Sequence, residues 1–237
     1  VVVGYTIYEP MNYEDANGEL IGFDTDLAKA VFEKLGYEVV FKLIDWDQKY
    51  TELNSGAIQC IWNGFTANTA DDDGVARADK VDFSYNYMGN KQVIVAKADL
   101  NAAIADAKSL SGKVGAVENS SAGDTYLTEN LEGAIKKGVA SQLDAMKELS
   151  LGAVDFVVVD EQLAKAYVGK GDYAGFEISD KIYSDAEYYA IGFKKGSELT
   201  ANVNAVLEEL AEDGTIAKLA ETYGVSNTAI TDFSDQK

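Results

Sequence analysis

The stretch YEVVFKLIDWDQKYTELNSGAIQCIWNG, residues 37–64, alternates two kinds of segment. Residues 37–44 and 58–62 are rich in apolar, β-branched and aromatic residues, which is typical of strands. Residues 46–55, between them, have the length and composition of a helix. This alternation of strand and helix predicts an α/β domain with a mostly parallel sheet.

The preceding segment follows the same pattern toward the N-terminus. Residues 1–8 predict a strand, and residues 17–18, Asn-Gly between two apolar runs, predict a tight hairpin. A helix is then expected to begin with Asp24 or Thr25 as its cap. Gly36 is expected to end it, because glycine readily takes the left-handed conformation that often follows a helix.

The alternation returns after residue 90. Strands are predicted over residues 93–95, 114–117, 154–159 and 188–193, and helices from residue 120 and over residues 144–149, 162–168, 199–211 and 216–223. The stretch ELNSGAI at 52–58 is similar to ELSLGAV at 148–154. Two lobes of similar construction would produce such a repeat, although a match this short can also arise by chance. The polar tail beyond Val225 is expected to be loosely ordered.

Composition excludes several classes of protein. A net charge of -20 disfavours nucleic acid and anionic membranes as partners, because these require clustered lysine and arginine. Without histidine the chain cannot form a Ser-His-Asp triad, a Cys-His pair or a histidine-ligated zinc site. The single cysteine, Cys60, excludes an intramolecular disulfide and is expected to be a buried, inert thiol.

Membrane and targeting signals are also weak. No apolar run is long enough to span a bilayer. The chain opens directly on the strand-like run at Val1, so a targeting segment is expected to have been removed or never to have existed.

Three places in the sequence carry candidate chemistry. Arg77 is the only arginine, and a guanidinium can grip a carboxylate through two parallel hydrogen bonds; a surface ion pair with the aspartates at 71–73 is the alternative. Ser120 and Ser121 stand at a helix start after a strand, where exposed amides favour an anion, although an ordinary serine cap has the same sequence. Asp160 ends an apolar strand at the edge where α/β folds bind ligands, and a role as cap of the next helix is equally compatible.

Together these groups match the two charged ends of a free α-amino acid. Arg77 and the helix start at residues 120–121 would hold a carboxylate, and Asp160 would accept hydrogen bonds from an ammonium group. Tyr8, Trp46 and Trp62 offer aromatic faces that could close over the rest of the ligand, although such residues are more often part of a core.

At these positions the chain resembles a known family, the bacterial extracellular solute-binding proteins of family 3, which are the amino-acid-binding components of ABC importers. The resemblance extends over essentially the whole chain. The blocks that carry it are residues 18–24 (GELIGFD) with Leu27-Ala28, Gly64-Phe65-Thr66 through Arg77 to Val81-Asp82-Phe83-Ser84, Val114-Gly115 with Ser120-Ser121, and Val154-Asp155 with Asp160-Glu161.

The resemblance implies an α/β fold of the type II periplasmic-binding-protein kind, in which two lobes joined by two hinge strands close on a ligand. Each lobe would hold a mixed sheet flanked by helices. Lobe 1 would comprise residues 1–89 and 187–237, and lobe 2 residues 90–186. The hinge strands would lie near residues 87–92 and 186–190.

The ligand-binding residues implied by the resemblance are Tyr8, Trp46, Asn63, Gly64, Thr66, Arg77, Val117, Ser120, Ser121 and Asp160. Arg77 would bind the ligand carboxylate, assisted by Thr66 and the backbone near Ser121, and Asp160 would bind the amine together with Gly64. The protein would be a monomer that delivers a free amino acid to an ABC transporter permease. It would act outside the cytoplasm, free in the periplasm or as a lipoprotein whose signal peptide has been removed. No catalytic residue, metal or cofactor is expected.

Two features depart from the family pattern. An insertion at residues 71–74 separates Thr66 from Arg77. It could be a calcium loop, but it lacks the alternating ligands and the distal glutamate of an EF-hand, so a solvated turn is favoured. Asn119 stands where a glycine is common, and asparagine is the residue that best tolerates the left-handed conformation in its place.

The class of ligand and two other functions stay open. Tyr5 and Val117 stand where some relatives carry charged residues, which favours an uncharged or zwitterionic polar amino acid unless Glu9, Lys49 or Glu118 supplies a counter-charge. An enzyme on the same scaffold, similar to cyclohexadienyl dehydratase, would need Glu9 or Glu118 as its acid or base. A ligand-sensing receptor domain is the third possibility.

Overall fold

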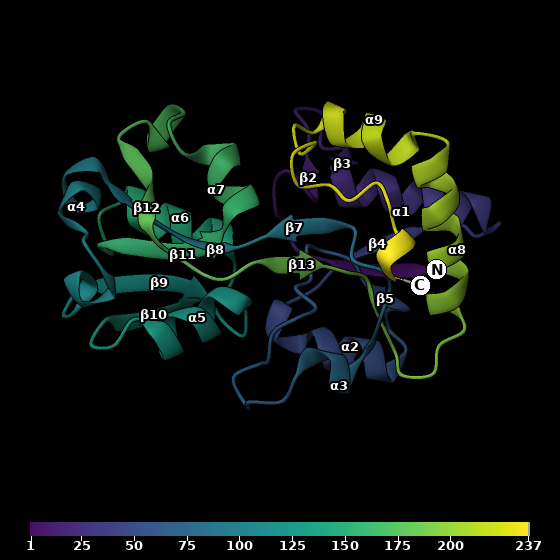
Figure 1. Ribbon diagram of the computed structural model, residues 1–237, viewed down its shortest axis with the longest axis horizontal. Helices are drawn as coiled ribbons and strands as arrows, with labels where there is room; N and C mark the ends of the chain where they lie inside the picture. The colour runs from purple at the N-terminus through teal and green to yellow at the C-terminus, as the bar shows by residue number, and fades with distance from the viewer. Residues whose placement is uncertain (237) are drawn as a thin grey trace. The chain divides into compact units, whose positions relative to one another are not determined.

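The stretch of residues 37–64 lies in the first of two units into which the chain divides (Figure 1). The computed structural model describes residues 1–236. Unit 1 comprises Val1–Thr69, Val75–Asn90 and the chain from Tyr188 on, and unit 2 comprises Ala70–Gly74 and Lys91–Glu187. The short acidic segment Ala70–Gly74 groups with unit 2, which the sequence did not indicate. Each unit is built around a five-stranded sheet.

Unit 1 holds a mixed sheet in the order β4-β1-β5-β14-β6. Its strands are β1 (Val2–Tyr5), β4 (Val40–Leu43), β5 (Cys60–Ile61), β6 (Asp82–Phe83) and β14 (Gly192–Phe193). β1 is parallel to β4 and β5, so that Val3 lies opposite Phe41 on one side and Cys60 on the other. β14 is antiparallel to β5 and β6. The predicted strand–helix–strand stretch therefore supplies parallel strands, and the antiparallel strand comes from the end of the chain.

Two small sheets and a set of helices complete the described part of unit 1. β2 (Tyr13–Glu14) pairs with β3 (Leu20–Ile21), which confirms the hairpin at residues 17–18, and β7 (Met88–Asn90) pairs with β13 (Glu187–Tyr189). The helices are α1 (Phe23–Lys34), α2 (Lys49–Ser55) after a 3-10 turn at Trp46–Gln48, α3 (Arg77–Lys80), α8 (Leu199–Glu212) and α9 (Thr215–Thr222). The strand predicted over residues 188–193 is thus divided between β13 and β14.

Helix α1 begins directly after Gly22, so the predicted cap at Asp24 or Thr25 is wrong. Gly22 has a φ of 130°, and a Cβ on it would lie 2.1 Å from the carbonyl oxygen of Met11. Only glycine fits such a position. Asp24 and Thr25 instead lie inside the first turn, where both are buried. The end of the helix is as predicted, because Gly36 is left-handed with a φ of 76°.

The C-terminal tail packs on unit 1, so the prediction that it is loosely ordered is wrong. Phe233 is 3% exposed, and its ring stacks on Tyr85 with the ring centroids 5.7 Å apart. Ala229 forms a β-bridge with Met88, and a short 3-10 helix spans Ser234–Gln236. The tail is held by this aromatic contact together with hydrogen bonds to residues 86–89, including one from the Ile230 N–H to the Tyr87 carbonyl oxygen at 2.8 Å.

Unit 2 holds the second mixed sheet, in the order β10-β9-β11-β8-β12. Its strands are β8 (Gln92–Lys97), β9 (Val114–Glu118), β10 (Ile135–Val139), β11 (Phe156–Asp160) and β12 (Phe176–Tyr183). β9 is parallel to β10 and β11, whereas β8 is antiparallel to β11 and β12. Because β9 and β11 are parallel, their carboxyl ends lie at the same edge of the sheet, which is where α/β folds place ligands.

The helices of unit 2 connect and cover these strands (Figure 1). They are α4 (Ala98–Ala103), α5 (Ala122–Asn130), α6 (Gln142–Ser150) and α7 (Glu161–Tyr167), with 3-10 turns at Ala107–Leu110 and Gly171–Tyr173. α5 follows β9 and α7 follows β11. Apolar side chains of β8, β11 and α5, including Ile94, Phe156 and Leu127, form the core beneath.

The structure bears on the expected environment of Cys60 and on the expected lack of a membrane-spanning segment. Cys60 is a fully buried free thiol in β5, and burial raises its pKa, as predicted for an inert cysteine. Among residues 1–236, the helices are too short or too polar for any of them to cross a membrane.

Candidate ligand-binding site

Arg77 is the first residue of α3, and its side chain is buried, with 1% of its surface exposed. Its Nη1 donates a hydrogen bond to the carbonyl oxygen of Thr66 at 3.2 Å. The guanidinium carbon lies 5.1 Å from the centre of the Phe65 ring. Burying a guanidinium is costly unless polar partners compensate it, and the Thr66 carbonyl oxygen is one such partner.

The loop from Asn63 to Thr66 is held by hydrogen bonds on both sides. Gly64 donates its backbone N–H to Oδ2 of Asp24 at 2.7 Å. The Asn63 side chain accepts a bond from the Thr6 hydroxyl at 2.6 Å and donates one to Oδ1 of Asn12 at 2.8 Å. The Asn63 side chain is therefore engaged inside unit 1, which leaves the main chain of this loop as the part suited to a ligand.

Gly64 could not be replaced by another residue without a change in its surroundings. Its φ is 56°, and a Cβ on it would lie 2.6 Å from Cε1 of Tyr8 and 3.0 Å from Cε2 of Tyr189. The two tyrosines contact each other as well, since their hydroxyl oxygens are 2.6 Å apart. Tyr8, predicted as a ligand-binding residue, is 3% exposed in this arrangement.

The two tryptophans have different environments. Trp62 is fully buried, with its ring 6.1 Å from that of Phe32, so it belongs to the core. Trp46 is 6% exposed at the start of the 3-10 turn. Lys49 is 1% exposed, and its Nζ lies 4.8 Å from the centre of the Trp46 ring and 4.9 Å from that of Tyr50. A buried cation therefore lies directly against Trp46.

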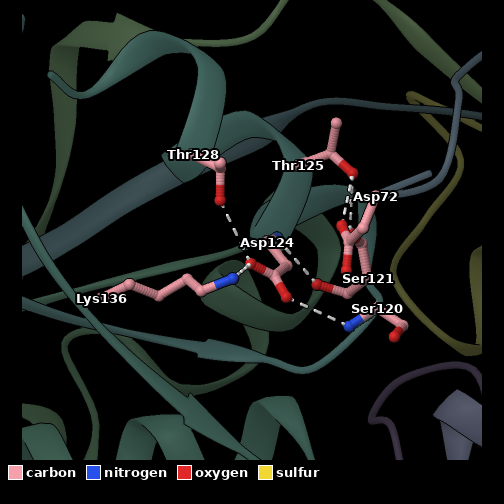
Figure 2. Close-up of polar contacts among 7 residues, drawn as sticks. All are labelled: Asp72, Ser120, Ser121, Asp124, Thr125, Thr128 and Lys136. Atoms are coloured by element: carbon pink, nitrogen blue, oxygen red, sulfur yellow. Dashed lines mark hydrogen bonds and ion pairs between the residues drawn. The ribbon is translucent and has the colours of Figure 1, made fainter. Parts of the chain in front are cut away.

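Unit 2 contributes the start of α5, shown in Figure 2. Ser121 is the N-cap, and its Oγ accepts a hydrogen bond from the Asp124 N–H at 3.1 Å, as the serine-cap alternative predicted. The side-chain carboxylate of Asp124 accepts hydrogen bonds from the N–H of Ser120 at 3.2 Å and from Nζ of Lys136 at 2.6 Å. The first-turn amides of residues 122–123 have no partner within the helix and can still receive an anion.

The left-handed residue in this turn is Ser120, with a φ of 58°, and not Asn119 as expected. The Asn119 side chain fits against Gly138 of β10 instead, where a Cβ would lie 2.0 Å from its Oδ1. The N–H of Asn119 donates to the Val139 carbonyl oxygen at 3.0 Å. These contacts hold Asn119 beside β10 and leave the reversal of direction to the next residue.

The acidic insertion lies against the same helix. The hydroxyl of Thr125 donates to Oδ1 of Asp72 at 3.3 Å, and the Gly74 N–H closes a turn on the Asp71 carbonyl oxygen at 2.8 Å. Asp71 is 8% exposed, whereas Asp72 is exposed. No group of three acidic or cysteine side chains among residues 1–236 is arranged to hold a metal ion.

Asp160 ends β11 and is 5% exposed. Its side chain makes no capping bond to α7. Its Oδ1 accepts from Nε2 of Gln92 at 2.6 Å, its Oδ2 accepts from Nε2 of Gln142, and its N–H donates to Oε1 of Gln142 at 2.8 Å. Two glutamines thus orient the carboxyl group. Val117 is fully buried in the core of unit 2, and we assign its side chain no ligand contact.

Asp24, Gln92, Gln142 and Tyr189 were missed as members of these networks. Asp24 is fully buried, and burial raises its pKa to about 7, although its bonds from Gly64 and Tyr87 act in the opposite direction. The burial of Asp24 could have been predicted from the sequence. It shares the face of α1 that carries Leu27, Ala28 and Val31, which are also buried, so a carboxyl group was to be expected inside.

Comparisons with known proteins agree with this fold and chemistry. The chain matches the family model of the bacterial extracellular solute-binding proteins, family 3, over residues 1–226. The chain belongs to this family. It is 30% identical over 219 residues to the arginine-binding extracellular protein ArtP of Bacillus subtilis (strain 168). The aligned region covers 91% of this chain and 82% of ArtP.

Solved structures give the same result. An ancestral arginine-binding protein bound to arginine matches with a TM-score of 0.84 and 36% identity, covering 94% of this chain and 97% of that one. The ancestral amino acid-binding protein AncCDT-1, a precursor of cyclohexadienyl dehydratase, matches with a TM-score of 0.83 and 30% identity, covering 94% of both chains. The predicted fold class, α/β of the type II periplasmic-binding-protein kind, is confirmed, and the protein is of an extracellular family.

Proposed function

We propose that this protein binds a free α-amino acid outside the cytoplasm and delivers it to an ABC transporter permease. The ligand carboxylate is bound by Arg77, the Thr66 region and the amides at the start of α5. The ammonium is bound by Asp160 and by main-chain carbonyl groups at residues 63–64. The observation that carries the proposal is the pair of Arg77 and Asp160, two buried charges of opposite sign held by neighbouring polar groups.

The two charges belong to different units, Arg77 to unit 1 and Asp160 to unit 2. Residues 1–89 and 187–237 form one lobe in this proposal, and residues 90–186 form the other. A ligand that bonds to residues of both lobes selects the conformation in which both can reach it. Such selection is the basis on which a permease can distinguish the loaded protein from the empty one.

The side chain of the ligand is uncharged or zwitterionic in this proposal. Lys49 supports it, because its buried Nζ lies 4.8 Å from the centre of the Trp46 ring. If Trp46 packs around the ligand, a second cation there would be repelled at close range. ArtP is named for binding arginine, which is cationic, so binding of arginine in a screen would contradict this part of the proposal most directly.

The first experiment is a thermal-shift screen against the twenty amino acids and cystine, because a ligand that binds only the folded protein raises its unfolding temperature. Calorimetry then measures the affinity for the ligand found. Replacing Arg77 by alanine is expected to weaken binding by about thirtyfold or more, since removal of one partner from a desolvated charge pair costs roughly 2–5 kcal/mol. Arg77→Lys is expected to recover only part of this loss, because lysine lacks the planar fork.

A matched control is Lys80→Ala, which removes a cation from the other end of α3 and should leave the affinity unchanged. Circular dichroism at the temperature of the binding experiment shows whether each variant is folded. A folded Arg77→Ala protein with wild-type affinity would remove Arg77 from the site. Absence of stabilisation by any compound in the screen would contradict amino-acid binding itself.

Binding without chemical conversion is part of the proposal. The relatives that match over most of the chain are named as binding proteins, and one of them, AncCDT-1, is also named as a precursor of an enzyme. The test is to incubate the ligand with the protein and record its proton NMR spectrum. An unchanged spectrum after many hours is expected, and a new product would favour the enzyme alternative.

A further inference from the structure

A buried carboxyl group lies beside the proposed amine-binding loop. Asp24 has no exposed surface, and its Oδ2 accepts hydrogen bonds from the Gly64 N–H at 2.7 Å and from the Tyr87 hydroxyl at 2.9 Å. Its Oδ1 is buried without a hydrogen-bond partner among the described residues. A buried carboxyl group with one oxygen unsatisfied is costly, so its presence beside this loop calls for an explanation.

Asp24 fixes the orientation of a peptide group through its bond to Gly64. The peptide between Asn63 and Gly64 is planar and trans, so a bond that holds its N–H toward Asp24 turns the Asn63 carbonyl to the opposite side. Gly64 is also restricted to glycine, because its φ is 56° and a Cβ on it would lie 2.6 Å from the Tyr8 ring and 3.0 Å from the Tyr189 ring. The orientation of the Asn63 carbonyl is therefore set by Asp24.

Asp24 is also connected to the segments by which the chain leaves and re-enters unit 1. Tyr87, which donates to Asp24, directly precedes β7, and β7 ends at Asn90, the last residue before the chain passes to unit 2. The Tyr87 N–H donates to the Tyr189 carbonyl oxygen at 2.9 Å, and Tyr189 ends β13, where the chain returns. One carboxyl group thus holds both the loop and the pair of crossing strands.

We infer that Asp24 is a positioning residue for recognition of the ligand's ammonium group: it orients the carbonyl group of Asn63 and ties it to the crossing strands at Tyr87. The inference rests on the proposed function. Asp24 itself makes no contact with the ligand in this scheme. Its effect on affinity is transmitted through Gly64, and it concerns the amine end of the ligand alone.

The test compares the ligand with its deamino analogue, which keeps the carboxylate and side chain but carries hydrogen in place of the ammonium group. Affinities of both are measured by calorimetry, the weaker one by displacement. Asp24→Ala is expected to reduce the preference for the amino acid over the analogue by about tenfold or more, which is the loss of roughly one well-oriented hydrogen bond. Asp24→Asn, which keeps an acceptor, is expected to recover much of the preference.

Asp26→Asn is the matched control, because Asp26 lies in the same turn of α1 but bonds to Lys29 and Tyr223 instead of Gly64. It should leave the preference unchanged. If Asp24→Ala weakens both ligands by the same factor, or neither, then Asp24 has no specific role at the amine end and the inference is overturned.

A second measurement does not depend on a ligand. Amide hydrogen exchange at Gly64, followed by NMR, should be slow in the wild-type protein and in Asp26→Asn, and faster by about tenfold or more in Asp24→Ala, because the N–H loses its acceptor. Unchanged exchange at Gly64 overturns the inference even if amino acids bind. Faster exchange in a protein that binds no amino acid refutes the proposed function and leaves the role of Asp24 in fixing the loop. If Asp24→Ala does not fold, both measurements are made with the same expected results on Asp24→Ser, whose side chain is shorter than the carboxyl group that accepts from the Gly64 N–H.

Discussion

Asp24 should make the stability of the protein depend on pH in an unusual direction. Burial raises its pKa from 3.8 to about 7 in the folded protein. The folded state therefore holds the proton where the unfolded state has released it, and stability falls as the pH rises from about 4 to about 7. The contribution is fully present below the unfolded pKa and has been lost above about pH 7. At about 1.4 kcal/mol for each unit between the two pKa values, the whole change is at most about 4 kcal/mol.

The assay is urea denaturation at pH values from 5 to 8, applied to the wild-type protein and to Asp24→Asn. Other carboxyl groups of the chain titrate in both proteins, so the difference between the two free energies of unfolding isolates Asp24. Over this window the wild-type protein is expected to lose about 2–3 kcal/mol relative to Asp24→Asn, with the change levelling off near pH 7. The residues that face the carboxyl group, Gly64 and Tyr87, carry no charge in this range.

Two results would refute the reasoning. Parallel stability curves for the two proteins would mean that Asp24 has the same pKa in the folded and unfolded states. A wild-type protein that gains stability relative to the variant as the pH rises would mean that the hydrogen bonds from Gly64 and Tyr87 outweigh burial, because they favour the ionised form.

Three further substitutions test other parts of the structure. Gly64→Ala introduces a Cβ at a φ of 56° and 2.6 Å from a tyrosine ring, and should lower the free energy of unfolding by about 2 kcal/mol or more and weaken ligand binding, as measured by denaturation and calorimetry. Lys136→Met removes the partner 2.6 Å from the buried carboxylate of Asp124 and should cost about 1–3 kcal/mol in urea denaturation, whereas Lys137→Met, which breaks a pair whose carboxylate is only partly buried, should cost less than about 1 kcal/mol; equal costs would contradict the assignment. Phe233→Ala should cost about 3 kcal/mol and lower the unfolding temperature in a thermal scan, and an unchanged temperature would mean that the tail does not stabilise unit 1.

The sequence predicted the elements whose signals are local. The hairpin at residues 17–18, the end of α1 at Gly36 and the cap at Ser121 each follow from the chemistry of one or two residues. Strands β10 and β12 were missed because they are the outermost strands of their sheet and lack a continuous apolar pattern. In β10, IKKGV, the two lysines and the glycine give no strand signal, and only pairing with β9 places it in the sheet.

In the candidate site, too, features with a local signal could be predicted from the sequence, whereas features set by the fold could not. The types of residue that suit an amino acid could be found in the sequence, because a lone arginine and a carboxylate at a strand end are visible there. Their partners could not, because they are set by the fold. Gln92 and Gln142 bond to Asp160 across 68 and 18 residues of sequence, and the Asp24–Gly64 bond spans 40 residues. Asp24 was interpreted as a helix cap because an acidic residue after a turn usually is one, and the crowding at Gly22 moved the helix start.

The distribution of polar groups in unit 1 has a consequence for specificity. Thr6, Asn12 and Asn63 are buried side chains that could serve a ligand, yet the structure uses their hydrogen bonds to hold the loops around residues 6–12 and 63–66. In the proposed function, recognition in this unit then falls to main-chain groups and to Arg77, which would bind the carboxylate and ammonium groups that all α-amino acids share. Under that proposal, selection among ligand side chains comes from residues outside that network, and Lys49, whose Nζ lies 4.8 Å from the centre of the Trp46 ring, is our candidate for it. Removing that charge with Lys49→Met should therefore shift preference toward cationic amino acids without loss of the common carboxylate and ammonium contacts, and an unaltered ligand ranking in the thermal-shift screen would show that selectivity arises elsewhere.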